Sequence, residues 1–137
     1  MVVQPYLSFE GRCEEALEFY GGAIGAKVAM LMRFKDSPDP NMSAGLQPGH
    51  ENKILHCAFQ VGDSTLFGSD GRCSGKPNFQ GISLSLTVAD VAEAERRFNG
   101  LAAGGQVVQP LTETFFSPRF GMVADRFGIT WMVLVVR

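Results

Sequence analysis

Few side chains in this sequence could carry out acid–base, nucleophilic or metal chemistry, and its two histidines come first. His56 lies in an apolar segment, where an imidazole could hydrogen-bond a ligand or act as a general acid or base near neutral pH. A core or dimer-interface histidine is the favoured alternative, because the sequence shows no orienting partner for a lone imidazole. His50 falls in a polar stretch and is expected at the surface.

The cysteines and the glycine-rich segments add no second chemistry. Cys13, Cys57 and Cys73 are odd in number, far apart and without a C-x-x-C pair, which is typical of reduced thiols in a cytoplasmic protein. The segments GRCSGKP and AAGGQ lack the spacing of a phosphate-binding loop, and neither G-x-S-x-G nor G-x-G-x-x-G follows an expected strand. The sequence therefore does not support a hydrolase or a dinucleotide-binding enzyme.

The composition is that of an ordinary globular protein, and we expect residues 1–137 to form a single domain. The net charge is only -2 and there is no basic run, so neither nucleic acid nor a membrane is expected as a partner. The amino terminus lacks the layout of a signal peptide, and no apolar stretch approaches the ~20 residues that cross a bilayer. We therefore expect a cytoplasmic protein.

The spacing of apolar residues predicts the order β-α-β-β-β twice, in modules at 1–70 and 81–137 joined by a polar loop at 71–80. In the first module, strands are expected at 3–9, 26–34, 53–61 and 64–70, a helix at 14–23 and a long loop at 35–52. In the second, strands are expected at 81–88, 106–114, 120–125 and 128–136 and a helix at 91–103. Pro110 predicts an irregular or edge strand, because proline cannot donate to a sheet.

Local signals mark the helix ends, and faint repeats link the two modules. Gly25 is a natural stop for the first helix, and Asp90 with Glu93 has the spacing of a helix start that satisfies free backbone N–H groups. The matches that favour a duplication are Ala16 with Ala94 and Tyr20 with Phe98 at an offset of 78, and Ala58 with Ala124 at an offset of 66.

Four stretches of the chain resemble the PhnB-like (glyoxalase-like) branch of the vicinal-oxygen-chelate superfamily. They are PYLSFEGRCEEALEFYGGAIGA, ILHCAFQVGDSTLFGSD, LTVADVAEAERRFNGLAAGG and PLTETFFSPRFGMVADRFGITW. The resemblance implies an α+β fold in which two βαβββ modules form an open, curved, mixed sheet around a cavity, as in glyoxalases, bleomycin-resistance proteins and dioxygenases. It also implies a homodimer, and a cavity that binds either a divalent metal or a small molecule without a metal.

The positions where the superfamily carries metal ligands do not carry them in this chain. By resemblance these positions fall on Pro5 (or Gln4, one residue off), Leu66, Ser83 and Met132. Zn²⁺, Mn²⁺ and Fe²⁺ prefer imidazole and carboxylate donors, which these residues do not supply. A rebuilt site would need His56 with two carboxylates, and the candidates, Asp70, Glu113 and Asp125, fall at strand ends or turns where acidic residues are usually solvated. We therefore expect no metal and no other cofactor.

The cavity expected from the resemblance would have a mostly apolar and adaptable lining. Strand alternation places residues two apart on one face of a sheet. The candidate ligand-binding residues are His56, Leu66, Ser83, Ser85, Phe115, Phe116, Met122 and Met132. Plain core packing is the alternative for each apolar member of this set.

Three functions remain open at this point, because one scaffold supports many reactions. The first is a metal-free protein that binds a small hydrophobic or aromatic molecule. The second is a cofactor-free enzyme with His56 as acid or base, and the third is a metal-dependent lyase, transferase or dioxygenase. A ubiquinone-pathway methyltransferase, a label attached to this branch, is not expected, because a typical methyltransferase is larger and has a glycine-rich cofactor loop.

Overall fold

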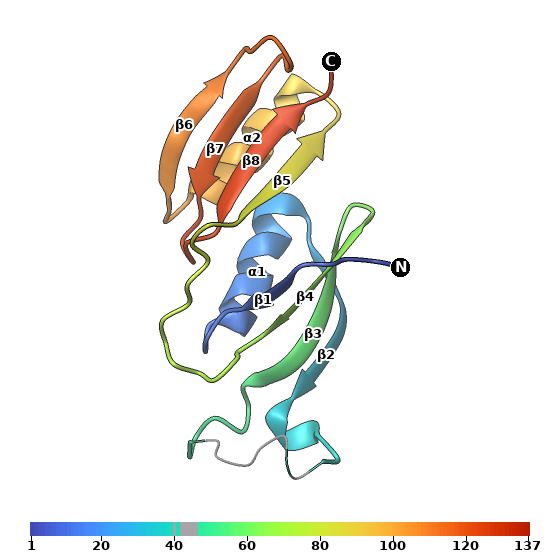
Figure 1. Ribbon diagram of the computed structural model, residues 1–137, viewed down its shortest axis with the longest axis vertical. Helices are drawn as coiled ribbons and strands as arrows, with labels where there is room; N and C mark the ends of the chain where they lie inside the picture. Colours follow the sequence, from blue (N-terminus) through green and yellow to red (C-terminus); the bar gives the residue numbers. More distant parts are fainter. Residues whose placement is uncertain (40, 42–46) are drawn as a thin grey trace. The chain divides into compact units, whose positions relative to one another are not determined.

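The computed structural model describes residues 1–39, 41 and 47–137, and its elements follow the order β-α-β-β-β twice (Figure 1). The first run comprises β1 (Tyr6–Ser8), α1 (Cys13–Ile24), β2 (Lys27–Arg33), β3 (Ile54–Val61) and β4 (Ser64–Ser69), with a short 3₁₀ helix η1 (Phe34–Asp36) after β2. The second comprises β5 (Ser83–Val88), α2 (Val91–Ala102), β6 (Gln106–Thr112), β7 (Phe120–Ala124) and β8 (Thr130–Val135). The chain divides into two compact units, Met1–Pro77 and Asn78–Arg137, each with its own sheet.

The first unit is a four-stranded mixed sheet in the order β1-β4-β3-β2 with α1 against one face. The short strand β1 runs parallel to β4, and the other neighbours are antiparallel. Apolar residues of α1 recur at helical spacing, and this face is buried: Cys13, Ala16, Leu17, Tyr20, Ala23 and Ile24. Tyr20 stacks on Phe59 of β3, with ring centroids 6.2 Å apart, so the core of this unit lies between α1 and β3.

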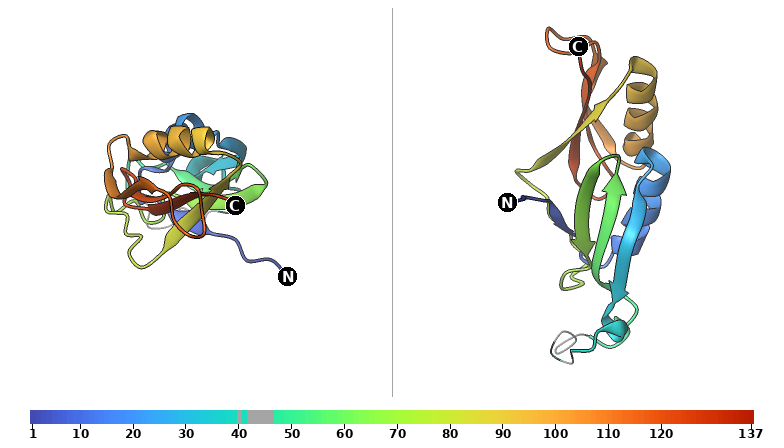
Figure 2. Two further views of the ribbon diagram at one scale, coloured as in Figure 1. Left: turned by 90° about the horizontal axis from the view of Figure 1, so that it is seen from above. Right: turned by 90° about the vertical axis from the view of Figure 1, so that its right-hand side faces the viewer.

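The second unit repeats this architecture in the order β5-β8-β7-β6, with β5 parallel to β8. Helix α2 contacts β7 and β8 through Ala94, Phe98 and Leu101, which are buried. Alternate residues of β8 face the helix, so Trp131 and Val133 belong to the core. In each unit the helix lies along one face of its sheet (Figure 2).

The structure confirms the fold class and the order of elements predicted from the sequence. Residues Ala16, Tyr20, Ala94 and Phe98, which match between the modules, occupy equivalent buried positions on the two helices. Pro110 lies in β6, which is an edge strand with register shifts, as its missing N–H requires. The turn η1 was not predicted, and part of the expected loop at 35–52 lies outside the described residues.

The ends of the two helices are fixed in different ways. Gly25 ends α1 in the left-handed conformation, with φ 70°, and its N–H donates to the carbonyl of Tyr20. Asp90 caps α2 by accepting a hydrogen bond from the N–H of Glu93 at 2.8 Å, as the sequence predicted. The described part of the chain contains no helix with the length and apolar character of a membrane span.

Candidate ligand-binding faces

The face of the first sheet that lies opposite α1 carries three aromatic rings from three strands. Cys57 and Phe59 of β3 are fully buried toward α1, so strand alternation places His56 on the opposite face. Tyr6 of β1 lies opposite Phe67 of β4 in the parallel ladder. The ring centroids of Tyr6, His56 and Phe67 lie 5.6–6.3 Å apart, and the ring planes differ by 25–28°. We call these three residues the ring cluster.

His56 has an orienting partner in the ring cluster. The hydroxyl of Tyr6 lies 3.1 Å from Nδ1 of His56, within hydrogen-bond distance, and Tyr6 is half-exposed. This contact could not be predicted from the sequence, because the two residues are 50 positions apart and meet only through the β1-β4-β3 pairing. His56 therefore has the geometric support that a ligand-binding or acid–base imidazole needs.

Leu66 does not lie on this face, contrary to the expectation. It is 6% exposed and pairs with Phe59, so its side chain faces α1 in the core. Phe67, one residue further along β4, lies on the open face instead. Side chains alternate between the two faces of a strand, so an alignment error of one residue assigns every side chain to the wrong face. The repeat offset of 66 misplaced Leu66 in this way.

The open face of the second sheet carries the remaining strand candidates. Ser85, Met132 and Met122 form one row across β5, β8 and β7, because Ser85 pairs with Met132 and Met132 with Met122. Ser83 is exposed two residues before Ser85 on the same face. These four side chains alternate along their strands with residues that face α2, and the sequence predicted this orientation. Their role in ligand binding stays a prediction.

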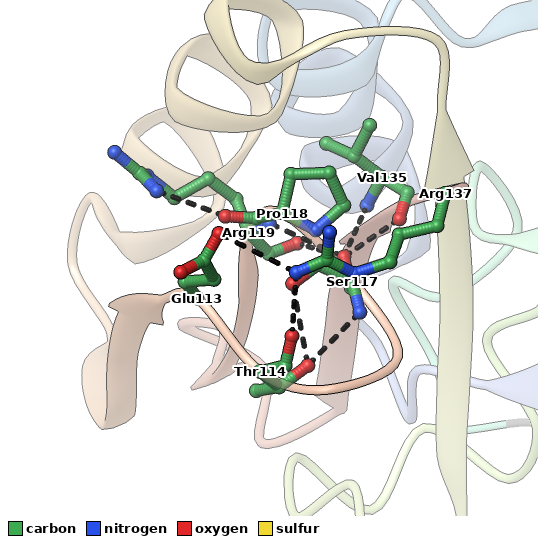
Figure 3. Close-up of polar contacts among 7 residues, drawn as sticks. All are labelled: Glu113, Thr114, Ser117, Pro118, Arg119, Val135 and Arg137. Carbon is green, nitrogen blue, oxygen red and sulfur yellow. Dashed lines mark hydrogen bonds and ion pairs between the residues drawn. The ribbon is translucent and has the colours of Figure 1, made fainter.

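The loop between β6 and β7 carries Phe115 and Phe116, and a buried hydroxyl holds it in place (Figure 3). Ser117 Oγ accepts hydrogen bonds from the backbone N–H groups of Arg119 and Val135, and the carbonyl oxygens of both residues lie 2.6–2.7 Å from it. Thr114 accepts from the N–H of Ser117 through its hydroxyl and donates its own N–H to the Ser117 carbonyl. The loop is thereby tied to the end of β8.

This loop holds its two phenylalanines at the surface. Phe115 is 93% exposed, and its ring meets Phe116 edge to face at 5.1 Å. Phe116 in turn meets Phe120 of β7, also at 5.1 Å. Phe120 alternates with Gly121, which faces α2, so the three rings run from the loop to the open face of the second sheet.

The carboxylates considered for a rebuilt metal site are engaged in the fold. Asp70 is 1% exposed and accepts hydrogen bonds from the backbone N–H groups of Cys13 and Ile54, at 2.7 and 2.6 Å. Asp125 is 4% exposed and accepts from two backbone N–H groups and from the Trp131 indole. The expectation that these two residues are solvated is therefore wrong. Glu113 is exposed and pairs with Arg137 at 3.4 Å.

The residues of this chain do not fit the metal site of the superfamily. The carboxylate oxygens of Asp70 and Asp125 already accept hydrogen bonds from fixed donors inside the fold, so these two carboxylates are not free to join His56 as ligands. Within residues 1–39, 41 and 47–137, no three His, Cys, Asp or Glu side chains come together in a metal-binding arrangement. His50, expected at the surface, is partly buried, and no described residue hydrogen-bonds its Nδ1.

Two of the three free thiols meet in the core of the first unit, on the helix side of β3. The Sγ atoms of Cys13 and Cys57 lie 3.7 Å apart, and both residues are fully buried. The hydrogen bond to Cys57 and burial raise the pKa of the Cys13 thiol, so this group stays protonated and unreactive at neutral pH. Cys73 is partly exposed.

Comparison with known proteins connects the whole chain to one family. Residues 2–134 match the sequence model of a family described as 3-demethylubiquinone-9 3-methyltransferase. Protein YjdN of Escherichia coli is 34% identical over 143 residues, covering 100% of this chain and 97% of its own.

Solved structures share the fold over nearly their full length. Protein PA1353 from Pseudomonas aeruginosa is 39% identical with a TM-score of 0.84, covering 99% of this chain and 98% of its own. A PhnB protein from Bacillus cereus is 26% identical with a TM-score of 0.80, covering 99% and 100%. A glyoxylase/bleomycin resistance protein/dioxygenase domain from Frankia, 17% identical with a TM-score of 0.64 over 100% and 98% of the two chains, shows the same fold.

Proposed function

The chain belongs to the PhnB-like family described as 3-demethylubiquinone-9 3-methyltransferase, within the glyoxalase/bleomycin-resistance fold, and on that premise we propose that it binds small apolar or aromatic molecules without a metal. The observation that carries the proposal is the make-up of the open sheet faces. Methionines, aromatic rings and small hydroxyl side chains line them, and such surfaces adapt to flat apolar molecules.

The methyl transfer named in the family's description is not part of this proposal. A typical methyltransferase carries its cofactor on a doubly wound domain with a glycine-rich loop. This chain instead forms two mixed four-stranded sheets, and its glycine-rich segments lie in turns.

Methionine methyl groups provide a direct test of binding, because they lie on both candidate faces. Met30 and Met32 pair with Ala58 and His56 in the first sheet, and Met122 and Met132 pair with each other in the second. With ¹³C-methyl-methionine protein, a panel of small aromatic compounds should shift the signals of one of these pairs in a saturable way. A panel that moves no methionine signal and leaves the melting temperature unchanged would contradict the proposal.

The metal-free part of the proposal needs a separate measurement. Mass spectrometry of untagged protein, purified without chelator from cells supplied with Mn, Fe, Co, Ni and Zn, should find every metal far below one equivalent. About one equivalent of a single metal would contradict this part and would support the metal-dependent alternative.

A cofactor-free enzyme is a second candidate, and the hydrogen bond between Tyr6 and His56 favours it. An imidazole with a fixed partner can transfer a proton at a defined position. If a bound compound is turned over, replacing His56 with Gln should abolish turnover while Met30 and Met32 still report binding. Turnover that survives this replacement would exclude His56 as the acid or base.

A further inference from the structure

The hydrogen-bonded pair of Tyr6 and His56 offers one free donor in either of its neutral arrangements. If the phenol donates to Nδ1, the imidazole proton resides on Nε2; if Nδ1–H donates to the phenol oxygen, the phenol keeps a free O–H. Among the residues that the structure describes, no acceptor pairs with Nε2. The open face of the first sheet therefore holds an unused N–H or O–H donor beside the ring of Phe67.

We propose, as an extension of the binding function above, that this face takes a neutral, planar conjugated ring that bears a carbonyl oxygen. The ring would stack against the ring cluster, and its oxygen would accept a hydrogen bond from the Tyr6–His56 pair. The nearly parallel planes of the three rings favour a flat partner over a branched aliphatic one.

The neighbouring side chains favour an uncharged ligand. The row through the ring cluster runs Tyr6, Phe67, Ala58 and Met30 across four strands, and the row beside it pairs His56 with Met32. Apart from the imidazole of His56 itself, neither row contains an acidic or basic side chain, so a charged group on the ligand would lose its hydration without meeting a fixed opposite charge. A carbonyl oxygen needs only the single donor that the pair provides.

Two compounds of similar shape separate the hydrogen bond from the stacking. The first is 2-acetylnaphthalene, which has a carbonyl acceptor, and the second is 2-isopropylnaphthalene, which has none. Each is titrated into ¹³C-methyl-methionine protein, and dissociation constants are taken from the shifts. We expect both to move the signals of Met30 and Met32 through the ring current of the naphthalene.

The informative variant is the double replacement Tyr6→Phe with His56→Phe, which keeps three rings and removes every donor. It should weaken binding of the ketone about three- to tenfold, the usual effect of one hydrogen bond, and change binding of the hydrocarbon less than twofold. Each single replacement leaves one donor and should have a smaller effect. Phe19→Leu, on α1 and so on the side of the first sheet opposite the ring cluster, is the matched control and should change neither constant.

The outcomes distinguish this inference from the broader function. Equal weakening of both compounds in the double variant, or no weakening of either, would overturn the carbonyl assignment. Shifts confined to Met122 and Met132 would overturn the choice of face and leave the binding function standing. Absence of any shift in the wild-type protein, with these compounds and with the wider panel, would overturn both. If the double replacement does not fold, the carbonyl ¹³C signal of the ketone bound to the wild-type protein tests the same hydrogen bond. It should lie downfield of its position in an apolar solvent, and an unchanged position would overturn the carbonyl assignment.

Discussion

At the scale of single residues, the polar groups that contribute most to the fold have no distinctive signal in the sequence. Asp70 appears in a turn-like SDG segment, yet its buried carboxylate joins the first N–H of α1 to the start of β3. Arg12, the local N-cap residue of α1, makes no side-chain cap, so Asp70 performs that role from the end of β4. A carboxylate at a helix amino terminus is also favoured by the helix dipole.

Replacing Asp70 with Asn should destabilise the protein by about 1–3 kcal/mol, because one of its two oxygen acceptors becomes a donor facing a buried N–H. Urea unfolding measures the loss. Asp63→Asn, in the exposed turn between β3 and β4, is the control and should change the free energy of unfolding by less than about 0.5 kcal/mol. Equal effects of the two replacements would show that the buried carboxylate is not what fixes α1.

The contact between Cys13 and Cys57 predicts a loss of stability in alkali. The same contact lowers the pKa of the Cys57 thiol, whereas the hydrogen bond to Cys57 and burial raise the pKa of Cys13 above its ordinary value of 9.0. Above pH 9 the folded chain therefore keeps the Cys13 proton, which the unfolded chain releases. The stabilising effect is thus complete below pH 9 and is lost as the pH rises further, by up to about 1.4 kcal/mol per pH unit.

Urea unfolding between pH 9.5 and 11 tests this slope, because Cys57, whose pKa is lowered, has lost its proton in both states by then. The double variant Cys13→Ala with Cys57→Ala should lose stability less steeply than the wild type, whatever its stability at pH 7. Packing losses lower stability at every pH alike and leave the slope unchanged. Identical slopes in the two proteins would contradict the raised thiol pKa.

At the scale of elements, the periodicity of apolar residues was enough to predict the strands and helices. It was not enough to predict how the strands pair or in which register. Alternation placed Met122, Met132 and Ser85 on the open face, because one face of each sheet is covered by a helix. Leu66 was misplaced because one repeat offset was carried across the whole hairpin. Only two residues separate β3 from β4, whereas residues 125–129 separate β7 from β8, and a local sequence comparison does not show how such loops shift the register.

Helix α1 allows a paired test of how its glycines act. Gly22 is exposed within the helix and a Cβ there would meet nothing within 4 Å, so Gly22→Ala should stabilise the protein by about 1 kcal/mol. Gly25 ends the helix with φ 70°, so Gly25→Ala should destabilise it by about 1–2 kcal/mol. Thermal unfolding measures both. The same sign for the two replacements would contradict the assigned end of α1.

At the scale of the whole molecule, the sequence predicted the architecture better than the site. The order β-α-β-β-β follows from local spacing, and so does the helix on one face of each sheet. The ring cluster forms because three strands that are distant in sequence lie side by side. The burial of Asp70 and Asp125 depends on the hydrogen bonds that their carboxylates accept within the fold. The spacing of residues along the sequence indicates neither property.

The homodimer implied by the family resemblance is also a property of the whole molecule and stays a prediction. Sedimentation equilibrium of the full chain at micromolar concentration should give twice the mass of one chain. A single-chain mass at that concentration would contradict it. The variant Phe115→Ser, which removes the most exposed ring, should show in the same experiment whether this loop contributes to assembly.

The hydrogen bonds of Ser117 affect the entropy with which any molecule binds to Phe115. A flexible loop loses conformational freedom on contact, and that loss opposes association. Here the backbone on either side of the ring is already fixed by hydrogen bonds to Ser117 and to the end of β8. A molecule that stacks on Phe115 should therefore bind with a small entropic penalty. Removing the hydroxyl by Ser117→Ala should make the binding entropy measured by calorimetry less favourable while the ring itself is unchanged.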